Sequence, residues 1–206
     1  MRARELSPAS VPGVRIGGSE LLLRFFEDAV RLAADRLLVL APYVDDAAFA
    51  DDAFRRAWQQ LLCTADITVV VRTALAAEVV ARRSARRGRN CDLRINPRLH
   101  AKVFVACRAG REIGLAGSHN LTGAALHANE EIGVLIGGGT VSELRGLARQ
   151  LREVAESIAR VSARYLLWPD RVGHSRQDAS RDNGTYIPCT RVHGCAQGAS
   201  GGSNSK

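Results

Sequence analysis

Two basic side chains near the middle of the chain could act on a phosphate ester. They lie in the stretch 98–136, RLHAKVFVACRAGREIGLAGSHNLTGAALHANEEIGVLI, within which residues 99–107 are predicted to form a β-strand. Because side chains two positions apart in a strand point the same way, His100 and Lys102 would share a face. An imidazole can attack phosphorus or transfer a proton, and an ammonium neutralises phosphate charge. The pair therefore predicts a face that meets an anion.

Further polar residues follow in the same stretch. Ser118, His119 and Asn120 fall between a predicted strand and a predicted short helix, and such a junction exposes backbone N–H groups that bind anions readily. Glu131 opens the next predicted strand. A carboxylate beside an imidazole holds its tautomer and favours its protonated form. The order of these groups along the chain is a more specific indication of phosphate chemistry than any single group is.

The ordered set of HxK, then GSHNLT, then NEE before an apolar strand resembles the phospholipase D superfamily, also called the HKD family. It is most similar to single-motif members, which include bacterial endonucleases and phage-defence proteins. The resemblance implies a metal-independent phosphodiesterase in which His100 is the nucleophile and forms a phosphohistidine. Lys102 and Asn120 would bind the non-bridging phosphate oxygens, Ser118 would support the phosphate pocket, and Glu131 would orient a catalytic histidine.

Two positions within the motif need separate interpretation. The family pattern has an aspartate five residues after the lysine, and this chain has Cys107 there, a departure that leaves room for a weakened or inactive enzyme. His119 occupies the variable position of the second motif group, GSHNLT. We expect it at the rim of the pocket, in contact with substrate.

A basic block leads into the HxK pair. Residues 82–98 hold seven arginines and one aspartate, a net charge of +6, and the whole chain carries +8. Such an excess favours an anionic partner such as nucleic acid. The block is either a solvated helix end or a track for a phosphate backbone. We favour the track, and its expected substrate-binding residues are Arg86, Arg87, Arg89 and Arg98.

The elements that must position these residues alternate between helix and strand. Apolar spacing predicts helices over 19–36, 74–87 and 121–126, one that begins after Asp45 or Asp46, and a last one from Thr140. Predicted strands cover 37–41, 66–72, 92–96, 99–107, 112–116 and 131–136. This alternation predicts an α/β fold, and the resemblance specifies a phospholipase D-like mixed β-sheet flanked by helices in a single domain.

The last predicted helix carries a regular apolar stripe. Thr140 and Glu143 would form its capping box. Its inner face is expected to consist of Leu144, Leu147, Leu151, Val154, Ile158 and Val161.

Composition sets the domain limits. We expect a flexible lead-in over 1–14, the phosphodiesterase domain over 15–168, and a disordered tail over 169–206, which is rich in Gly, Ser and Arg. The tail's Cys189, His193 and Cys195 fall short of the four ligands of a structural zinc site, and we expect no metal and no cofactor. No apolar run reaches the roughly 18 residues of a membrane span, and no export signal is evident, so the cytoplasm is the expected compartment.

These observations predict an enzyme, a nuclease that cleaves DNA rather than RNA and serves phage defence or restriction. One imidazole cannot both attack phosphorus and protonate the leaving group from the opposite side. The chain has a single HxK, so we expect a homodimer with a shared active site. Two alternatives stay open: a phospholipase D or phosphatidyltransferase, and a catalytically weak nucleic-acid-binding subunit of a defence complex.

Overall fold

The computed structural model describes residues 13–85, 91–137 and 142–165. The predicted disordered tail, Thr140 of the predicted capping box, and most of the predicted lead-in fall outside these ranges. So do three of the predicted substrate-binding residues, Arg86, Arg87 and Arg89.

An eight-stranded mixed sheet forms the centre of the described structure, with strand order β1-β7-β6-β5-β2-β3-β4-β8. Strands β2, β3 and β4 run parallel, and the other neighbouring pairs are antiparallel. The strands are β1 Val14–Gly17, β2 Arg36–Leu40, β3 Asp66–Val71, β4 Cys91–Ile95, β5 Val103–Arg108, β6 Arg111–Gly117, β7 Gly133–Gly137 and β8 Ala163–Arg164.

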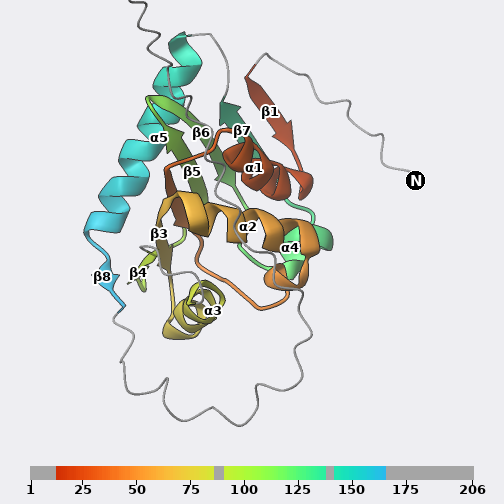
Figure 1. The fold of residues 1–206 in the computed structure, drawn as a ribbon, viewed down its shortest axis with the longest axis vertical. Helices are drawn as coiled ribbons and strands as arrows, with labels where there is room; N and C mark the ends of the chain where they lie inside the picture. The colour runs from red at the N-terminus through yellow and green to blue at the C-terminus, as the bar shows by residue number, and fades with distance from the viewer. Residues whose placement is uncertain (1–12, 86–90, 138–141, 166–206) are drawn as a thin grey trace, which may run out of the picture. The chain divides into compact units, whose positions relative to one another are not determined.

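Helices cover both faces of this sheet (Figure 1). They are α1 Glu20–Arg31, η1 Ala48–Ala50, α2 Asp52–Thr64, α3 Ala74–Ser84, α4 Gly123–His127 and α5 Ser142–Arg160. Alternate residues of β5 point to opposite sides, so Phe104 packs with α1 and α2 while Val103 and Val105 pack with α5. The predicted mixed α/β architecture is confirmed.

Aromatic side chains dominate the core on the α1–α2 side. Phe26 lies at its centre, with ring centroids 4.8 Å from Phe54, 5.3 Å from Phe25 and 6.0 Å from Phe104. Edge-to-face pairs of this kind add about 0.5–1.5 kcal/mol each beyond the area they bury. This cluster fixes α1 and α2 against the strands that lead to the predicted site.

The face that α5 presents to the sheet agrees only in part with its predicted apolar stripe: Leu151 and Ile158 pack against the core as expected. Leu147, Val154 and Val161 are exposed, and the buried positions of the helix are Ala148, Ala155 and Ala159. Small alanine side chains let the helix backbone come close to the sheet. Leu151 also fits over Gly114, where an added Cβ would lie 2.7 Å from its Cδ2 atom.

The aspartates before α2 also differ from the prediction. Asp51 is the N-cap of this helix, and its carboxylate accepts a hydrogen bond from the Phe54 N–H at 2.7 Å. Asp45 instead accepts from two backbone N–H groups, those of Ala48 and Gly123, each at 3.0 Å. It therefore joins η1 to the start of α4, which follows the Ser118–Asn120 group in sequence.

Two glycines give opposite predictions for substitution by alanine. At Gly117 a Cβ would collide with the Ile132 carbonyl oxygen and lie 2.7 Å from the Gly133 Cα atom, so Gly117→Ala should lower the free energy of unfolding by about 1–3 kcal/mol. At Gly146, inside α5, nothing lies within 4 Å, and Gly146→Ala should raise it by about 0.5–1 kcal/mol. Urea denaturation of both variants measures the difference. Equal effects would contradict the close approach of β6 and β7 at Gly117.

Candidate active site

The sheet topology brings the predicted catalytic residues to one edge. Because β6 is antiparallel to both β5 and β7, the end of β6 lies beside the starts of β5 and β7. Lys102 immediately precedes β5, Ser118 immediately follows β6, and Glu131 lies two residues before β7. The Gly117 N–H donates to the Lys102 carbonyl at 3.3 Å, which ties two of these segments together. We call this edge, with residues 100–102, 118–120 and 131, the HxK edge.

The HxK pair lies just outside the sheet, which corrects the predicted strand over 99–107. Strand β5 begins at Val103 because both neighbouring strands end beside it, β2 at Leu40 and β6 at Gly117. His100 is exposed. The Lys102 ammonium donates to the His100 carbonyl oxygen at 3.1 Å, so the cation lies against the backbone of its partner in the motif.

A tight turn after β4 holds the segment that carries His100. The Leu99 N–H donates to the Asn96 carbonyl at 2.9 Å, and the Arg98 N–H donates to the Asn96 side-chain oxygen at 3.0 Å. Leu99 is buried among residues of β2, β3 and β5. The exposed imidazole is therefore flanked by an anchored residue on its N-terminal side and a strand on its C-terminal side.

Ser118 and Glu131 form the best-connected pair of the HxK edge. The Ser118 hydroxyl donates to one carboxylate oxygen of Glu131 and accepts from the Ile132 N–H at 3.0 Å. The Asn129 amide donates to the other carboxylate oxygen at 3.1 Å. Among the described residues, Glu131 has no histidine partner in its own chain. Its predicted role of orienting a catalytic histidine stays a prediction.

His119 is completely buried, so the prediction that it lies at the pocket rim is wrong. Its Nε2 atom lies 2.8 Å from the Gly18 carbonyl oxygen, and this ring nitrogen must carry the proton because a carbonyl only accepts. The ring occupies space left by two glycines: a Cβ at Gly133 would lie 2.6 Å from its Cε1 atom, and one at Gly117 would lie 3.1 Å from its Nδ1 atom. This histidine links the end of β6 to the segment between β1 and α1.

Asn120 contributes a buried polar group without a partner. Its side-chain oxygen is buried and has no hydrogen bond within the described part of the chain. Leu121 next to it is fixed on both sides, since its N–H donates to the Tyr43 carbonyl at 3.1 Å and its carbonyl accepts from Asp45 at 3.2 Å. A 180° rotation of the amide exchanges oxygen and nitrogen, so this side chain can offer either an acceptor or N–H donors.

The described part of the basic block is mostly bonded within the chain. Arg82 and Arg83 pair with Asp46 at 2.6 and 2.9 Å. Arg94 pairs with Asp92 at 2.6 Å and also donates to the Ala159 carbonyl. Arg98 is exposed and has no acidic partner among the residues that the structure describes. Of the four predicted substrate-binding arginines, it is the one whose position near the HxK edge is defined.

Two residues at this edge were missed by the sequence reasoning. Tyr43 and Arg72 lie just beyond the carboxyl ends of β2 and β3, and the Arg72 guanidinium donates to the Tyr43 hydroxyl at 3.2 Å. Tyr43 is 49% exposed. The carboxyl ends of parallel strands are where open α/β sheets place their ligands, and that rule could have found both residues.

Across the described ranges, no three His, Cys, Asp or Glu side chains are placed to share a metal ion. No helix in those ranges is long and apolar enough to cross a membrane.

Comparison with solved structures identifies the fold. Nuc from Salmonella typhimurium, a phospholipase D family member, matches at TM-score 0.54 and 21% identity, over 76% of this chain and 100% of its own. The chain has the fold of the phospholipase D superfamily. Polyphosphate kinase from Porphyromonas gingivalis matches at TM-score 0.50 and 12% identity, over 76% of this chain and 27% of its own. No protein-family model and no curated protein sequence matches the chain.

The phospholipase D motif's aspartate position can now be located. Cys107 lies on β5 opposite Glu112 and Arg36, five residues beyond Lys102. At about 3.3 Å per residue, it is roughly 16 Å from the lysine along the strand. A carboxylate here would be too far away to contact a phosphate at the HxK edge. Whether its replacement weakens the site stays open.

The environment of Cys107 gives a testable property. Burial, with a smaller contribution from Glu112, raises the pKa of this thiol from 9.0 to about 11, and burial likewise raises the pKa of Cys91 to about 11. The thiolate is the reactive form, so near pH 8 both should alkylate about 100-fold more slowly in the folded protein than in urea. Iodoacetamide labelling followed by peptide mass spectrometry measures both rates. Equal rates would show that Cys107 is not in this buried environment.

Proposed function

We propose that this protein is a phosphodiesterase that hydrolyses nucleic acid, with DNA preferred over RNA. The observation that carries the proposal is the convergence of His100, Lys102, Ser118, Asn120 and Glu131 at one sheet edge. These residues come from three segments that are separated in sequence. No requirement of folding stability explains why an exposed imidazole, an ammonium and a carboxylate should gather there.

The proposed reaction has two displacements. His100 attacks phosphorus in line, forming an N–P bond as the bond to the leaving alcohol oxygen breaks and the alcohol takes up a proton. Water then attacks phosphorus, gives its proton to the group that protonated the alcohol, and breaks the N–P bond, which regenerates the imidazole. Lys102 and Asn120 would stabilise the charge on the non-bridging oxygens throughout. Ser118 would position Glu131, whose carboxylate it contacts.

Several features support nucleic acid as the substrate. The chain carries a net charge of +8. Arg98 is exposed in the turn after β4, and Arg72 donates to the hydroxyl of the exposed Tyr43 ring. An exposed ring next to cations suits base stacking combined with phosphate contacts. Nuc, whose fold matches over its whole length, is a phospholipase D family member. A role in phage defence or restriction stays a prediction.

The proposed nucleophile is tested by substitution. His100→Ala should abolish turnover, because it removes the proposed nucleophile, and Lys102→Ala should cost nearly as much. Neither should lower thermal stability measurably, since His100 is exposed and the Lys102 ammonium bonds only a backbone carbonyl. His127→Ala is the matched control: this histidine is exposed on α4 and forms only a surface pair with Asp51.

The assay uses single- and double-stranded DNA, RNA and phosphatidylcholine, each with and without EDTA. We expect DNA cleavage that survives chelation. Loss of activity with EDTA and recovery with Mg²⁺ would contradict the mechanism, and release of lipid headgroup alone would favour the phospholipase alternative. DNA binding without cleavage, unchanged in His100→Ala, would favour the non-catalytic subunit.

We also propose that two copies of the chain complete the site. The leaving group needs a general acid, and the other described histidines do not suit that role. His119 is buried with its Nε2 atom on a backbone carbonyl, and His127 lies on α4 beside Asp51. A two-fold dimer would place a second His100 opposite the first. One copy would attack while the other protonates the leaving alcohol.

Subunit mixing tests this arrangement. Wild-type and His100→Ala chains are exchanged to equilibrium at fixed total concentration. If the dimer holds one joint site, mixed dimers are inactive and activity follows the square of the wild-type fraction, so about a quarter remains in an equal mixture. A linear fall, or an active monomer in sedimentation, would show that each chain holds a complete site.

A further inference from the structure

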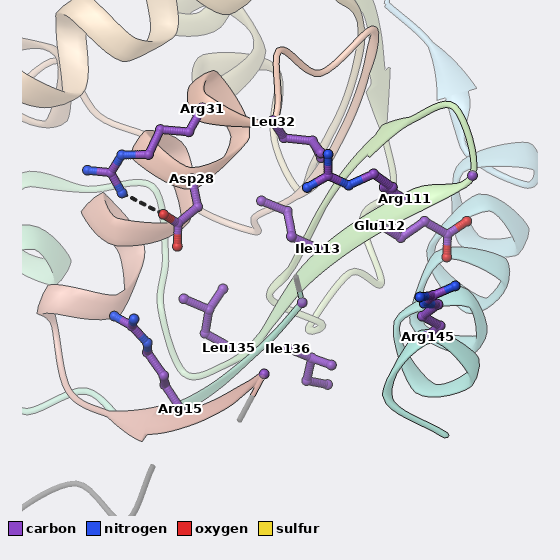
Figure 2. Close-up of a pocket in the computed structure, with 13 residues that line it drawn as sticks. Arg15, Asp28, Arg31, Leu32, Arg111, Glu112, Ile113, Leu135, Ile136 and Arg145 are labelled. Atoms are coloured by element: carbon purple, nitrogen blue, oxygen red, sulfur yellow. Dashed lines mark hydrogen bonds and ion pairs between the residues drawn. The ribbon is translucent and has the colours of Figure 1, made fainter. Parts of the chain in front are cut away.

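The cavity at the sheet edge opposite the HxK edge does not form one binding surface. Figure 2 shows Arg145 on α5, across the strands from Asp28 and Arg31 of α1. Leu135 is buried in the core on the α1–α2 side, so Ile136, the next residue of β7, points to the other side of the sheet. A single ligand would not contact both sets of residues.

The Tyr43 ring offers a contact surface at the HxK edge itself. Among the aromatic side chains that the structure describes, the five phenylalanines and Trp58 are buried, and Tyr165 is half-buried. Tyr43 is 49% exposed. Aromatic rings stabilise a fold mainly through the area that they bury, so stability does not explain a ring in this position.

Backbone contacts place Tyr43 next to Asn120. The Leu121 N–H donates to the Tyr43 carbonyl oxygen at 3.1 Å, and Val44 pairs with Leu121 in an isolated parallel bridge. Tyr43 and Asn120 each precede one of these two partners. Their backbones are therefore neighbours at about 4.8 Å, the spacing of paired strands.

The alternation of burial shows which way the two side chains point. Val44 and Leu121 are both buried in the core on the α1–α2 side of the sheet. Successive side chains of an extended chain point to opposite sides, so Tyr43 and Asn120 point away from that core. In agreement with this, Tyr43 is exposed and Asn120 is half-buried. The ring and the amide proposed to bind phosphate thus share one side of the bridge.

Arg72 holds the outer end of the ring. Its guanidinium donates to the Tyr43 hydroxyl at 3.2 Å, and its N–H donates to the Pro42 carbonyl at 3.2 Å. The ring is therefore fixed both at its backbone and at its hydroxyl. A tyrosine that is held in place in this way loses little conformational entropy when a ligand packs on it. Arg72 has no acidic partner in the described ranges, so its charge is available to a phosphate of the same ligand.

We propose that Tyr43 determines which form of nucleic acid is cleaved, by stacking on an unpaired base beside the phosphate that the HxK edge holds. Stacking on an aromatic ring accepts any base, because every base has a π-face. In a duplex both faces of a base are covered by neighbouring base pairs, so the ring needs a base that is free. Single strands are therefore preferred over duplex. This role rests on the proposed nuclease function, because it requires a nucleic-acid phosphate at the HxK edge.

Steady-state cleavage of three matched substrates tests this role. They are a single-stranded oligonucleotide, the same sequence as a duplex, and an oligomer of abasic tetrahydrofuran nucleotides. Wild type should prefer the single strand to the duplex. Tyr43→Ala should lower kcat/KM on the single strand about tenfold or more, because the stacked ring is lost, and should match wild type on the abasic oligomer.

Two further variants serve as controls. Tyr43→Phe keeps the ring and loses only the hydrogen bond to Arg72, so its kcat/KM on the single strand should fall only about threefold. Leu147→Ala removes another exposed apolar side chain, on α5 and outside the HxK segments, and should match wild type. Fluorescence anisotropy with His100→Ala and with His100→Ala/Tyr43→Ala should show weaker binding of the single strand by the double variant, without turnover.

The outcomes separate this role from the proposed function. Equal losses on the single strand and the abasic oligomer would show that Tyr43 only supports the fold of the edge, and would overturn the role. Wild-type cleavage by Tyr43→Ala, or equal cleavage of single strand and duplex by wild type, would also overturn it. In these cases nucleic acid is still cleaved and the proposed function stands. Absence of cleavage of every nucleic acid by wild type would overturn both.

Discussion

The pairing of β6 with both β5 and β7 is the constraint on which the candidate site depends. Strand β6 is antiparallel to both neighbours. The motif residues before β5, after β6 and before β7 therefore meet at the same edge of the sheet, although they span more than thirty residues of sequence. Ser118 completes this arrangement, since its N–H donates to the Ile132 carbonyl at 2.9 Å and its hydroxyl binds Glu131. These bonds fix the Glu131 carboxylate beside the end of β6, and Asn120 follows that strand.

The two glycines at this edge explain why the strands can approach so closely. Gly117 and Gly133 face each other in the register, and the buried ring of His119 fills the space that their missing side chains leave. A buried imidazole whose Nδ1 atom has no partner among the residues that the structure describes costs free energy. The hydrogen bond to the Gly18 carbonyl offsets part of that cost and brings the segment after β1 to the same edge.

The sequence predicted strands and helices well where the spacing of apolar residues determines them. It predicted burial less well where close contacts between distant residues determine which side chains are buried. The alternation of elements and the edge shared by His100 and Asn120 followed from spacing and from the family resemblance. The exposure of Leu147 and Val154 did not, because alanines that pack closely on the sheet outweigh the larger apolar residues of α5. The burial of His119 likewise depends on two glycines, one of them fourteen residues away, and spacing does not show such contacts.

The exposure of His100, the proposed nucleophile, also bears on how the proposed site would work. In the single chain, His100 is exposed, and the hydrogen bond from the half-buried Lys102 to the His100 carbonyl lies at the surface, where water screens the attraction between a cation and phosphate. A second copy placed over the HxK edge would exclude that water and strengthen every charge interaction with the substrate. Dimerisation would then do more than supply a second imidazole. It would turn an exposed edge, assembled mainly by backbone pairing, into an enclosed site in which one lysine and one amide per chain suffice to bind the phosphate.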